Sequence, residues 1–308
     1  WNIEGYTKLG FRLPKVSGFV GLRVAGEDRK GSLASGLGDF FRSGTELLTS
    51  ASLRYAPACD HELSLTHSSS YTRPSYRDLL GYTSIASAAF RRGGNSGLRT
   101  AYRRGLSLNY TYMRAAQLEL SYTDTEDPIV EAIPPMYGGG ITLRRYNLDY
   151  SRTLRALLVL PLPLVSQKKF SWLALTILAA QRQWDAGHIE TNDYSAQLNT
   201  QFVQHRHSFS LPSDWTVDLG VTYYSGVLYE LYRIQRQWWV DASVSKRMGN
   251  LRATLSARDP FNTNIARGNY NPEVNGLAFE RNWHSPRLEL TISYSWGKKS
   301  VKAQDTRA

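Results

Sequence analysis

The segment RLELTISYSWG, at residues 287–297, alternates strictly between polar and apolar side chains. Its apolar positions are Leu288, Leu290, Ile292, Tyr294 and Trp296. Successive side chains of an extended strand point to opposite faces, so this pattern predicts a strand with one apolar and one polar face. A helix turns by about 100° per residue and would scatter the same apolar residues around its surface. The apolar face of the strand therefore contacts either a protein core or a lipid bilayer.

The same alternation recurs along most of the chain, and helical periodicity is nearly absent. It is clear in the segments 106–112, 117–123, 217–224, 238–245 and 251–258. The chain also contains 19 Tyr, 8 Trp and 10 Phe, and aromatic residues suit both strands and membrane interfaces. The sequence therefore predicts an all-β fold of antiparallel strands.

Short and long connections take turns between these strands. The chain reverses within a few residues around Pro14, Ala58, Arg114, Ser213 and Gly249. Long polar segments lie between these reversals, at residues 26–44, 70–98, 125–140, 185–192, 227–233 and 260–284. Outer-membrane barrels have short periplasmic turns and longer extracellular loops around an apolar outer band and a polar interior. The pattern favours a transmembrane β-barrel in the bacterial outer membrane.

A soluble β-sandwich is the alternative fold, and it has no reason to gather its long loops at one end. The polar positions of the strands are rich in Ser, Thr, Asn, Gln, Arg and Tyr, which suits a hydrated lumen. Lipid cannot satisfy open backbone groups, so a sheet in a membrane must close. Membrane fractionation would separate the two folds.

The strand count bears on domain organisation. About 13 to 14 strands lie between the reversals, and bacterial single-chain barrels have even strand numbers. The first strand, near residues 7–13, and the last strand both run toward short turns, so they cannot pair antiparallel. The opening residues, WNIEGYTKLGF, lack a secretory signal, so either the protein is not exported or its beginning is missing. We expect the C-terminal portion of a longer protein, with barrel strands in residues 1–297 and a basic periplasmic tail at 298–308.

Composition argues against several other classes of protein. The net charge is +11, but Arg and Lys are dispersed and no basic helix or RNA-binding signature occurs, so no nucleic-acid partner is expected. The longest apolar run, at residues 156–165, contains two prolines and is too short for a spanning helix. The single cysteine, Cys59, cannot form an internal disulfide. No motif of nucleophilic, metalloprotease or nucleotide chemistry occurs, so no enzyme, catalytic residue or cofactor is expected.

Two segments contain residue types that bind metals, but neither has the pattern of a known metal site. HRH, at residues 205–207, places two imidazoles on one face of a strand, but no third ligand is identifiable. DTEDP, at residues 124–128, is acidic but lacks the ligand order of an EF-hand. We expect a solvated loop at the acidic segment and no metal site at either.

Four segments carry a family resemblance. They are YTRPSYRDLLGY at 71–82, GNSGL at 94–98, ARDPFNTN at 257–264 and PRLELTISYSWGKKSVK at 286–302. In this order they resemble the RPSYxDLNP, GNPNLKPE, DIFNTN and C-terminal segments of the Bacteroidetes-type outer-membrane β-barrel family, which is related to TonB-dependent receptors. Ser96, Thr100 and Ala101 stand where the second segment of the family has its two prolines and its glutamate.

The resemblance implies a function for the full protein. Such receptors carry an N-terminal plug, a TonB-contacting segment and the earlier strands of a barrel of about 22 strands, none of which is recognisable in this sequence. The full protein would admit an iron chelate, an oligosaccharide or a peptide through a gated lumen, and it would contact TonB only through those regions. The alternative is a non-transporting barrel that scaffolds a surface lipoprotein, an assembly complex or a secretion complex. The sequence upstream of Trp1 would separate the two.

The resemblance also implies roles for residues. The apolar positions of the last strand, from Leu288 to Trp296, would form the C-terminal signal that the barrel-assembly machinery reads. The alternative is that this segment is a last strand with no recognition role. The loop residues matching the family are Arg73, Pro74, Tyr76, Gly94, Asn95, Asp259, Phe261, Asn262 and Asn264. Pro74 must end a strand ladder, and DPFNTN suits a strand leaving the membrane. We expect structural roles for these loops rather than ligand contacts.

Overall fold

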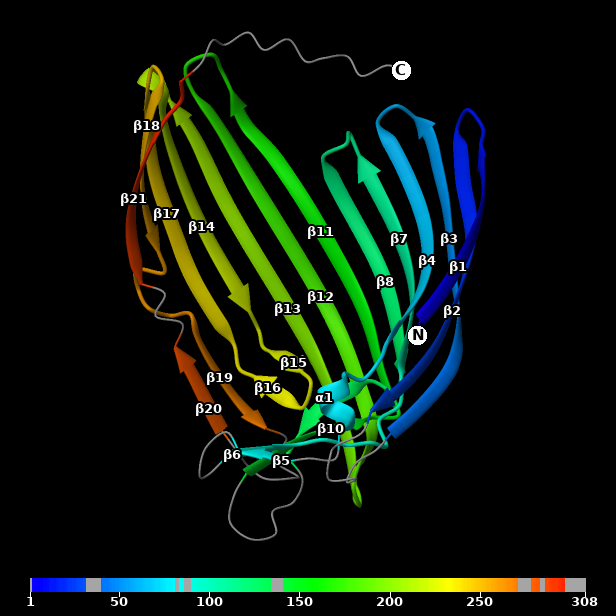
Figure 1. Ribbon diagram of the computed structural model, residues 1–308. Helices are drawn as coiled ribbons and strands as arrows, with labels where there is room; N and C mark the ends of the chain where they lie inside the picture. Colours follow the sequence, from blue (N-terminus) through cyan, green and yellow to red (C-terminus); the bar gives the residue numbers. More distant parts are fainter. Residues whose placement is uncertain are drawn as a thin grey trace.

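Each strand of the main sheet pairs with the next main-sheet strand along the chain, in one antiparallel sheet of 13 strands (Figure 1). The computed structural model describes residues 2–31, 40–80, 83–85, 90–133, 141–270, 278–282 and 286–296. The sheet consists of β1 (Asn2–Arg12), β2 (Val16–Gly31), β3 (Phe40–Ala58), β4 (His61–Thr72), β7 (Ala101–Tyr112), β8 (Ala116–Glu126), β11 (Tyr150–Ser166), β12 (Ser171–Ile189), β13 (Asn192–Leu211), β14 (Trp215–Tyr224), β17 (Gln237–Met248), β18 (Leu251–Arg258) and β21 (Arg287–Tyr294). The predicted all-β fold is confirmed.

Short elements occupy the connections at one end of the sheet. They are α1 (Tyr76–Leu79), β5 (Thr83–Ile85), β6 (Phe90–Gly93), β9 (Ile129–Ala132), β10 (Ile141–Asn147), β15 (Val227–Tyr229), β16 (Tyr232–Ile234), β19 (Ile265–Tyr270) and β20 (Ala278–Asn282). A 3₁₀ turn, η1 (Pro212–Asp214), closes one reversal at the other end. No helix within the described ranges is long and apolar enough to cross a membrane.

Two of the predicted long loops are wrong. Residues 26–31 pair with residues 40–45 as β2 and β3, and residues 185–189 pair with 192–196 as β12 and β13. Both hairpins continue the sheet after the apolar alternation has ended. Beyond the apolar band these strands need no lipid-facing side chains, and some of their residues, including Glu27, Asp185 and Ile189, are buried. The sequence therefore loses its alternation although the backbone pairing persists. The five predicted short reversals are all present, and a sixth lies between β11 and β12.

The two prolines of β11 sit where the strand is paired on one side only. Pro161 and Pro163 are opposite Leu175 and Leu173 of β12, whereas the pairing of β11 with β8 ends at Val159. Proline has no backbone N–H and is tolerated where that group would face no partner strand. The apolar run that contains these prolines is therefore part of a strand, β11.

The pairing register sorts side chains into an apolar and a polar face. Leu106, Tyr122 and Leu154 lie in one transverse row of β7, β8 and β11. Ser107, Ser121 and Arg155 form the adjacent row, and their side chains point to the opposite face. The polar face lies on the concave side of the curled sheet, where two grooves are lined by Ser, Thr, Gln, Arg, Asp and Glu side chains. The apolar face is left open to the surroundings.

The last strand follows this division. Leu288, Leu290 and Ile292 lie opposite Ala257, Leu255 and Ala253 of β18 on the apolar face. They are 72%, 64% and 64% exposed, so no second sheet or helix layer covers them. Glu289 lies opposite Ser256 on the polar face.

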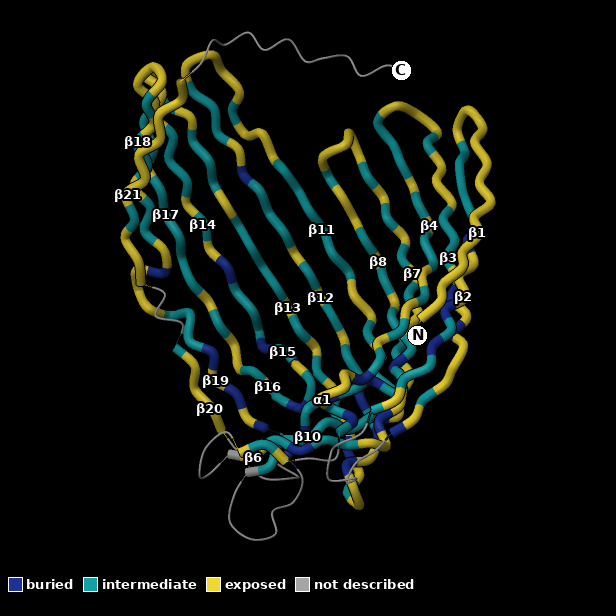
Figure 2. Tube along the Cα trace, viewed as in Figure 1, coloured by how far each residue is buried: buried dark blue, intermediate teal, exposed yellow. Residues whose placement is uncertain are grey.

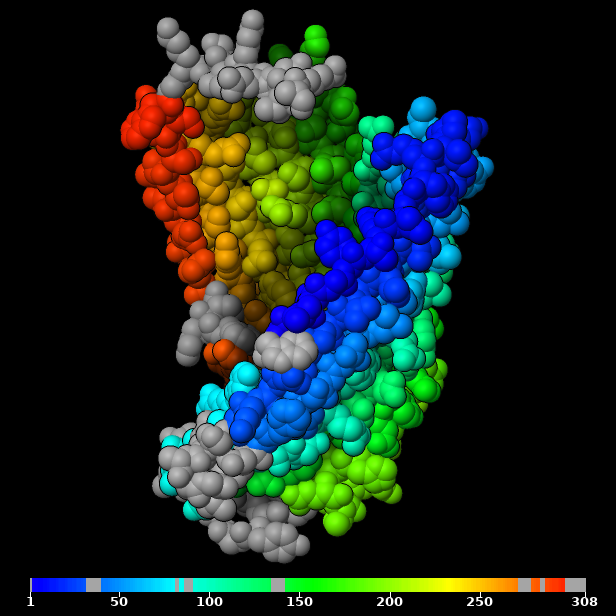
Figure 3. Space-filling model, turned by 45° about the vertical axis from the view of Figure 1, so that its right-hand side comes forward, coloured from blue at the N-terminus to red at the C-terminus, as the bar shows by residue number. Residues whose placement is uncertain are grey.

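The sheet has two open edges. Strands β1 and β21 run in the same direction, toward the end with the short turns (Figure 1). Within the described residues they do not pair with each other. In Figure 3 the gap between the blue edge and the red edge opens onto the concave wall behind.

The two faces predict different responses to a charge on β18. Leu255→Arg places a guanidinium on the apolar face near the middle of the strand, where we expect a cost of about 2–4 kcal/mol in lipid. Ser256→Arg points into a polar groove of about 280 Å³, where we expect a cost below about 0.5 kcal/mol. Urea unfolding of the full-length protein from lipid vesicles measures both. Equal losses would contradict the assignment of the faces.

Candidate functional site

The segment that contains RPSY folds into a capped turn where β4 ends. The hydroxyl of Ser75 accepts a hydrogen bond from the Asp78 amide at 3.2 Å, which caps α1. The Pro74 carbonyl accepts a hydrogen bond from the Arg29 guanidinium at 3.2 Å. The ring of Tyr76 packs against Phe40, with 5.7 Å between the centroids. The turn is thereby held against β2 and β3.

A buried ion pair anchors this turn. Arg73 Nε lies 2.9 Å from Glu27 Oε1, and the two side chains are 7% and 9% exposed. Arg29 pairs with the other oxygen of Glu27 at 2.6 Å, and the Arg73 guanidinium stacks over the Tyr71 ring at 4.3 Å. Removing one partner of a buried pair typically costs 3–5 kcal/mol, because the other charge stays buried. Sequence reasoning missed Glu27, which lies far from Arg73 along the chain and carries no local signal.

The second family-like segment docks directly onto the first. The Asn95 amide donates to the Asp78 carbonyl at 2.6 Å, and the Asn95 side chain donates to the Arg145 carbonyl at 2.9 Å. A Cβ atom on Gly94 would lie 1.6 Å from the Leu80 carbonyl oxygen, so the backbone approaches too closely for any side chain. The resemblance thus singled out segments that meet in space.

DPFNTN forms a tight turn after β18. One carboxylate oxygen of Asp259 accepts from the amide and the hydroxyl of Thr263 at 2.9 and 3.0 Å, and the other accepts from the Asn264 amide at 3.0 Å. Asn262 adopts a positive φ of 52°, and Phe261 is 66% exposed. Asp259 is 1% exposed, so its carboxylate serves the turn itself.

Two four-stranded sheets lie across the end of the main sheet that carries the long connections, in the orders β5-β6-β10-β9 and β15-β16-β19-β20 (Figure 1). We call these two sheets and α1 the cap. Buried residues gather there (Figure 2), and a shared core includes Val130, Leu231 and Tyr270. The backbone N–H of Ile133 donates a hydrogen bond to the Tyr270 hydroxyl oxygen at 2.7 Å. The two small sheets of the cap therefore share one core, whereas Leu79 of α1 packs in a separate cluster with Phe40 and Leu98.

Electrostatics within the cap follow from burial. Burial raises the pKa of Tyr270 to about 12, so its phenol stays neutral. Burial also raises the pKa of Glu230, and the nearby Glu131 carboxylate acts in the same direction. Glu230 Oε2 accepts the Glu131 amide hydrogen at 3.1 Å and joins the two cap sheets.

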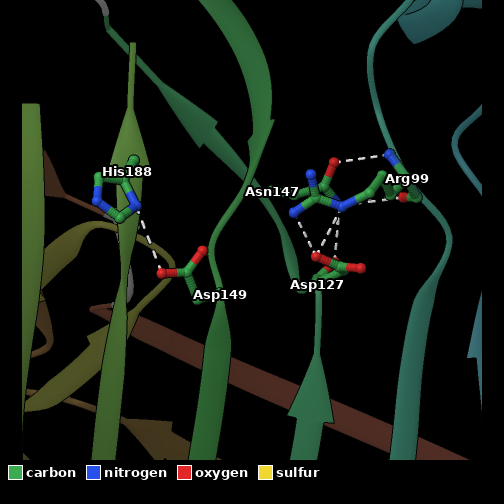
Figure 4. A network of polar contacts seen from close by, with 5 residues as sticks. All are labelled: Arg99, Asp127, Asn147, Asp149 and His188. Atoms are coloured by element: carbon green, nitrogen blue, oxygen red, sulfur yellow. Dashed lines mark hydrogen bonds and ion pairs between the residues drawn. The ribbon is translucent and has the colours of Figure 1, made fainter. Parts of the chain in front are cut away.

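A polar network ties the cap to the wall (Figure 4). Arg99 Nε donates to Asp127 at 2.8 Å, and the Asn147 side chain donates to the carbonyls of Asp127 and Arg99 at 2.7 and 3.0 Å. His188 lies 3.4 Å from Asp149 beside this network. The network joins the connections that follow β6 and β8 to the end of β10.

The expected solvated loop at the acidic segment is wrong for Asp124 and Glu126, which lie in the paired strand β8. The carboxylates of this segment pair with arginines. Asp127 pairs with Arg99, Asp124 pairs with Arg152 at 2.9 Å, and Glu126 lies 3.7 Å from Arg104. The three carboxylates therefore serve three different ion pairs. Within the described residues, no group of three His, Cys, Asp or Glu could hold a metal ion.

His205 and His207 lie on one face of β13, as their spacing predicts, and their neighbours Val221 and Leu219 show that it is the apolar face. Trp172 Nε1 donates to His207 Nδ1 at 2.9 Å, and the two histidine Nε2 atoms lie 2.9 Å apart. His205 Nδ1 lies 2.8 Å from Thr176 Oγ1. Because His207 Nδ1 accepts a hydrogen, its Nε2 carries one and donates to His205, which in turn donates to the threonine. Both nitrogens of each ring are engaged, so a metal would have to break this chain.

Polar grooves open on the inner wall within the part of the chain that the structure describes. The first groove has a volume of about 500 Å³, and its lining includes Ser68, Ser70, Arg103, Ser121, Thr153 and Arg155. The second groove, of about 280 Å³, is lined by Gln204, Arg206, Asp218, Thr222, Asp241 and Arg258, among others. In the second groove Arg206 pairs with Asp218 at 3.4 Å. Such walls can hold polar solutes.

The remaining predicted residues lie at the far end of the sheet. The rings of Tyr294 and Trp296 pack with 5.6 Å between centroids on the apolar side of β21. The predicted basic tail at 298–308 lies outside the described residues.

Comparison with known proteins agrees with this architecture. Residues 2–294 match a family model described as the outer membrane protein beta-barrel family. Similar solved structures include the copper transporter OprC (13% identity, TM-score 0.67, 94% of this chain and 47% of that one). They also include the FrpB iron transporter from Neisseria meningitidis (16%, 0.59, 95% and 45%) and the siderophore receptor PiuA from Acinetobacter baumannii (12%, 0.61, 94% and 42%). The chain thus spans less than half the length of these three, and such low identities show the fold alone. No curated protein sequence matched the chain.

The contact at Gly94 is testable. Gly94→Ala forces Leu80 or residue 94 to move, because the added Cβ would lie 1.6 Å from a carbonyl oxygen. We expect the local free energy of cap opening to fall by about 1–3 kcal/mol, measured by hydrogen exchange at the Asn95 amide. Gly5→Ala is the control, since a Cβ at Gly5 meets no atom within 4 Å. Unchanged exchange in the Gly94 variant would contradict the docking of the two segments.

The raised pKa of Glu230 predicts a pH dependence in the cap. A carboxyl group with a raised folded pKa contributes stability that is full below its unfolded pKa and is lost as the pH rises through the folded value. After correction for intrinsic exchange, the Glu131 amide should therefore open more readily at pH 7.5 than at pH 5. Both pH values lie about half a unit or more above the ordinary carboxyl pKa, so carboxyl groups with an ordinary pKa are mostly ionised at both. Glu230→Gln keeps an accepting oxygen and should abolish the difference. A difference that persists in this variant would assign the effect to another group.

Proposed function

The chain belongs to the outer membrane protein β-barrel family, which resides in the bacterial outer membrane, and on this premise we propose that it forms part of a receptor that admits a scarce nutrient through a gated lumen. The structure is receptor-like in its fold, with transporters and siderophore receptors among its structural neighbours. The work of such a protein is conformational gating rather than bond chemistry. We accordingly assign no catalytic residue.

One observation carries the proposal: an ordered cap lies over one end of a grooved polar wall whose other face is apolar. An apolar exterior suits lipid and a polar interior suits a hydrated passage. The cap would meet an incoming solute first. By the family resemblance the nutrient is an iron chelate, an oligosaccharide or a peptide, and the names of the neighbours, copper transporter and siderophore receptor, favour a metal or its chelate.

Closure of the wall requires partners for both edges. Since β1 and β21 run in the same direction, antiparallel closure takes an odd number of additional strands, and lipid does not tolerate open edges. We propose that residues 1–297 are the C-terminal part of a barrel of about 22 strands, and that residues 298–308 form a periplasmic tail. A plug and a TonB-contacting segment would belong to the rest of such a protein.

The motif residues have structural roles in this proposal. Arg73, Pro74, Tyr76, Gly94 and Asn95 hold α1 and its neighbouring segment in the cap. The DPFNTN turn positions the connection to β19. The alternating residues from Leu288 to Trp296 present an apolar edge that the barrel-assembly machinery would read during insertion.

A scaffold for a surface lipoprotein is the second candidate. It is favoured by large apolar side chains that stand exposed at the end of the sheet with the long connections: Phe41 at 69%, Ile85 at 74% and Tyr229 at 62%. Exposed apolar groups of this kind can mark a protein contact. A partner lipoprotein could cover them.

Deletion of the full-length gene tests the two candidates. A transporter predicts that the protein fractionates with the outer membrane and that its loss abolishes energised uptake of a ferric chelate, a copper salt, an oligosaccharide or a peptide offered as the sole source of that nutrient. Restoring the gene should restore uptake, and a protonophore should block it. Normal uptake of all four, with a lipoprotein lost from the surface, would instead establish the scaffold.

A further inference from the structure

We propose that the first groove of the inner wall is a binding site for an anionic solute that carries two or more carboxylate or phosphate groups, held by Arg103 and Arg155. This inference rests on the proposed function, because it places a ligand on the route through the lumen. It adds a solute class and a site to that function.

Within the described part of the chain, neither of these two arginines has a carboxylate within ion-pair distance. Among the residues that the structure describes, neither guanidinium makes a hydrogen bond, an ion pair or a ring contact. By contrast, Arg206 in the second groove is 3.4 Å from Asp218, which also accepts a hydrogen bond from Ser243. The guanidinium group presents five donors in a planar fork that matches carboxylate and phosphate oxygens. The first groove therefore offers unused capacity for oxyanions.

The hydroxyl groups between the two arginines complete the site. Ser121 lies opposite both Ser107 and Arg155, and Thr123 lies opposite both Gly105 and Thr153. All six line the groove with Arg103. Hydroxyl groups can donate to an anion without adding charge of their own. At Gly105 the wall has no side chain, which leaves room between the arginines.

The spacing selects for more than one anionic group. Arg103 is opposite Thr125, and Arg155 is opposite Ser121, so the two arginines differ by two strands and four residues of register. Standard strand spacings put their Cα atoms roughly 16 Å apart. Extended arginine side chains from both ends can then hold a polyanion of the size of citrate or pyrophosphate between them. A single small anion would engage only one guanidinium.

The position of the groove suits capture from the cap side. Arg103 is the third residue of β7 (Ala101–Tyr112) and lies opposite Ser70 of β4. The next pair toward the cap is Tyr71 with Tyr102, directly before the RPSY turn. A solute that passes the cap thus meets this groove before it reaches the short-turn end.

Glu119 makes the two ends of the site differ in charge. It lines the groove two residues along β8 from Ser121, toward the short turns. The lining then has two arginines and one carboxylate, which leaves a net charge of about +1 by formal count. Glu119 weakens the hold on an anion at the end where it would leave. Neutralising it should tighten binding.

Calorimetry on the folded full-length protein in detergent tests the site, with citrate and pyrophosphate as separate probes at low salt. We expect one or both to bind and their affinity to fall as salt rises. Arg103→Gln and Arg155→Gln should each weaken binding about tenfold, as expected for a lost charged hydrogen bond. Glu119→Gln should strengthen it severalfold. Arg206→Gln, in the second groove, is the matched control and should leave affinity within about twofold.

The outcomes separate this site from the proposed function. Binding of neither probe by folded wild-type protein, or equal affinity in the wild type and both groove variants, overturns the site even if gene deletion abolishes uptake. Weakened binding in the groove variants supports the site even if deletion leaves uptake intact, in which case transport alone fails. Binding of citrate only, or of pyrophosphate only, supports the site and identifies the oxyanion as carboxylate or phosphate.

Discussion

Backbone hydrogen bonding in a medium without water is the constraint on which the rest of the structure depends. In lipid, every N–H and C=O group must find a partner within the protein. The chain meets this demand by pairing each strand of the main sheet with the next one along the chain. Once backbone pairing fixes the strands, their side chains can only alternate between the two faces. The apolar–polar alternation of the sequence is the direct consequence.

This constraint explains what could be predicted. The alternation at Leu288, Leu290 and Ile292 predicted an apolar flank, and these residues are exposed on one face of β21. The short reversals were readable because turn residues interrupt the alternation. Beyond the apolar band the constraint lapses, and there the prediction failed. Polar residues 26–31 and 185–189 suggested loops, yet they extend the strands.

The cap is held together by contacts between segments that are far apart along the chain, and it was therefore harder to predict. Its two small sheets pack segments that are far apart along the chain around Val130, Leu231 and Tyr270. The buried pair of Arg73 with Glu27 is of the same kind. Periodicity carries no information about such contacts, because it describes only neighbours along one strand. The family resemblance found Arg73, Gly94 and Asn95, and only the structure shows that they converge on α1.

The central claim is that one face of the wall meets lipid and the other meets water. Single cysteines at residues 118–121 of β8, in a background with Cys59→Ser, test it in the full-length protein reconstituted into vesicles. The account predicts that fluorophores at positions 118 and 120 are quenched by brominated lipid, whereas cysteines at 119 and 121 react with a water-soluble thiol reagent. Equal responses at all four positions, or shielding of positions 118 and 120 from both lipid and water, would contradict it.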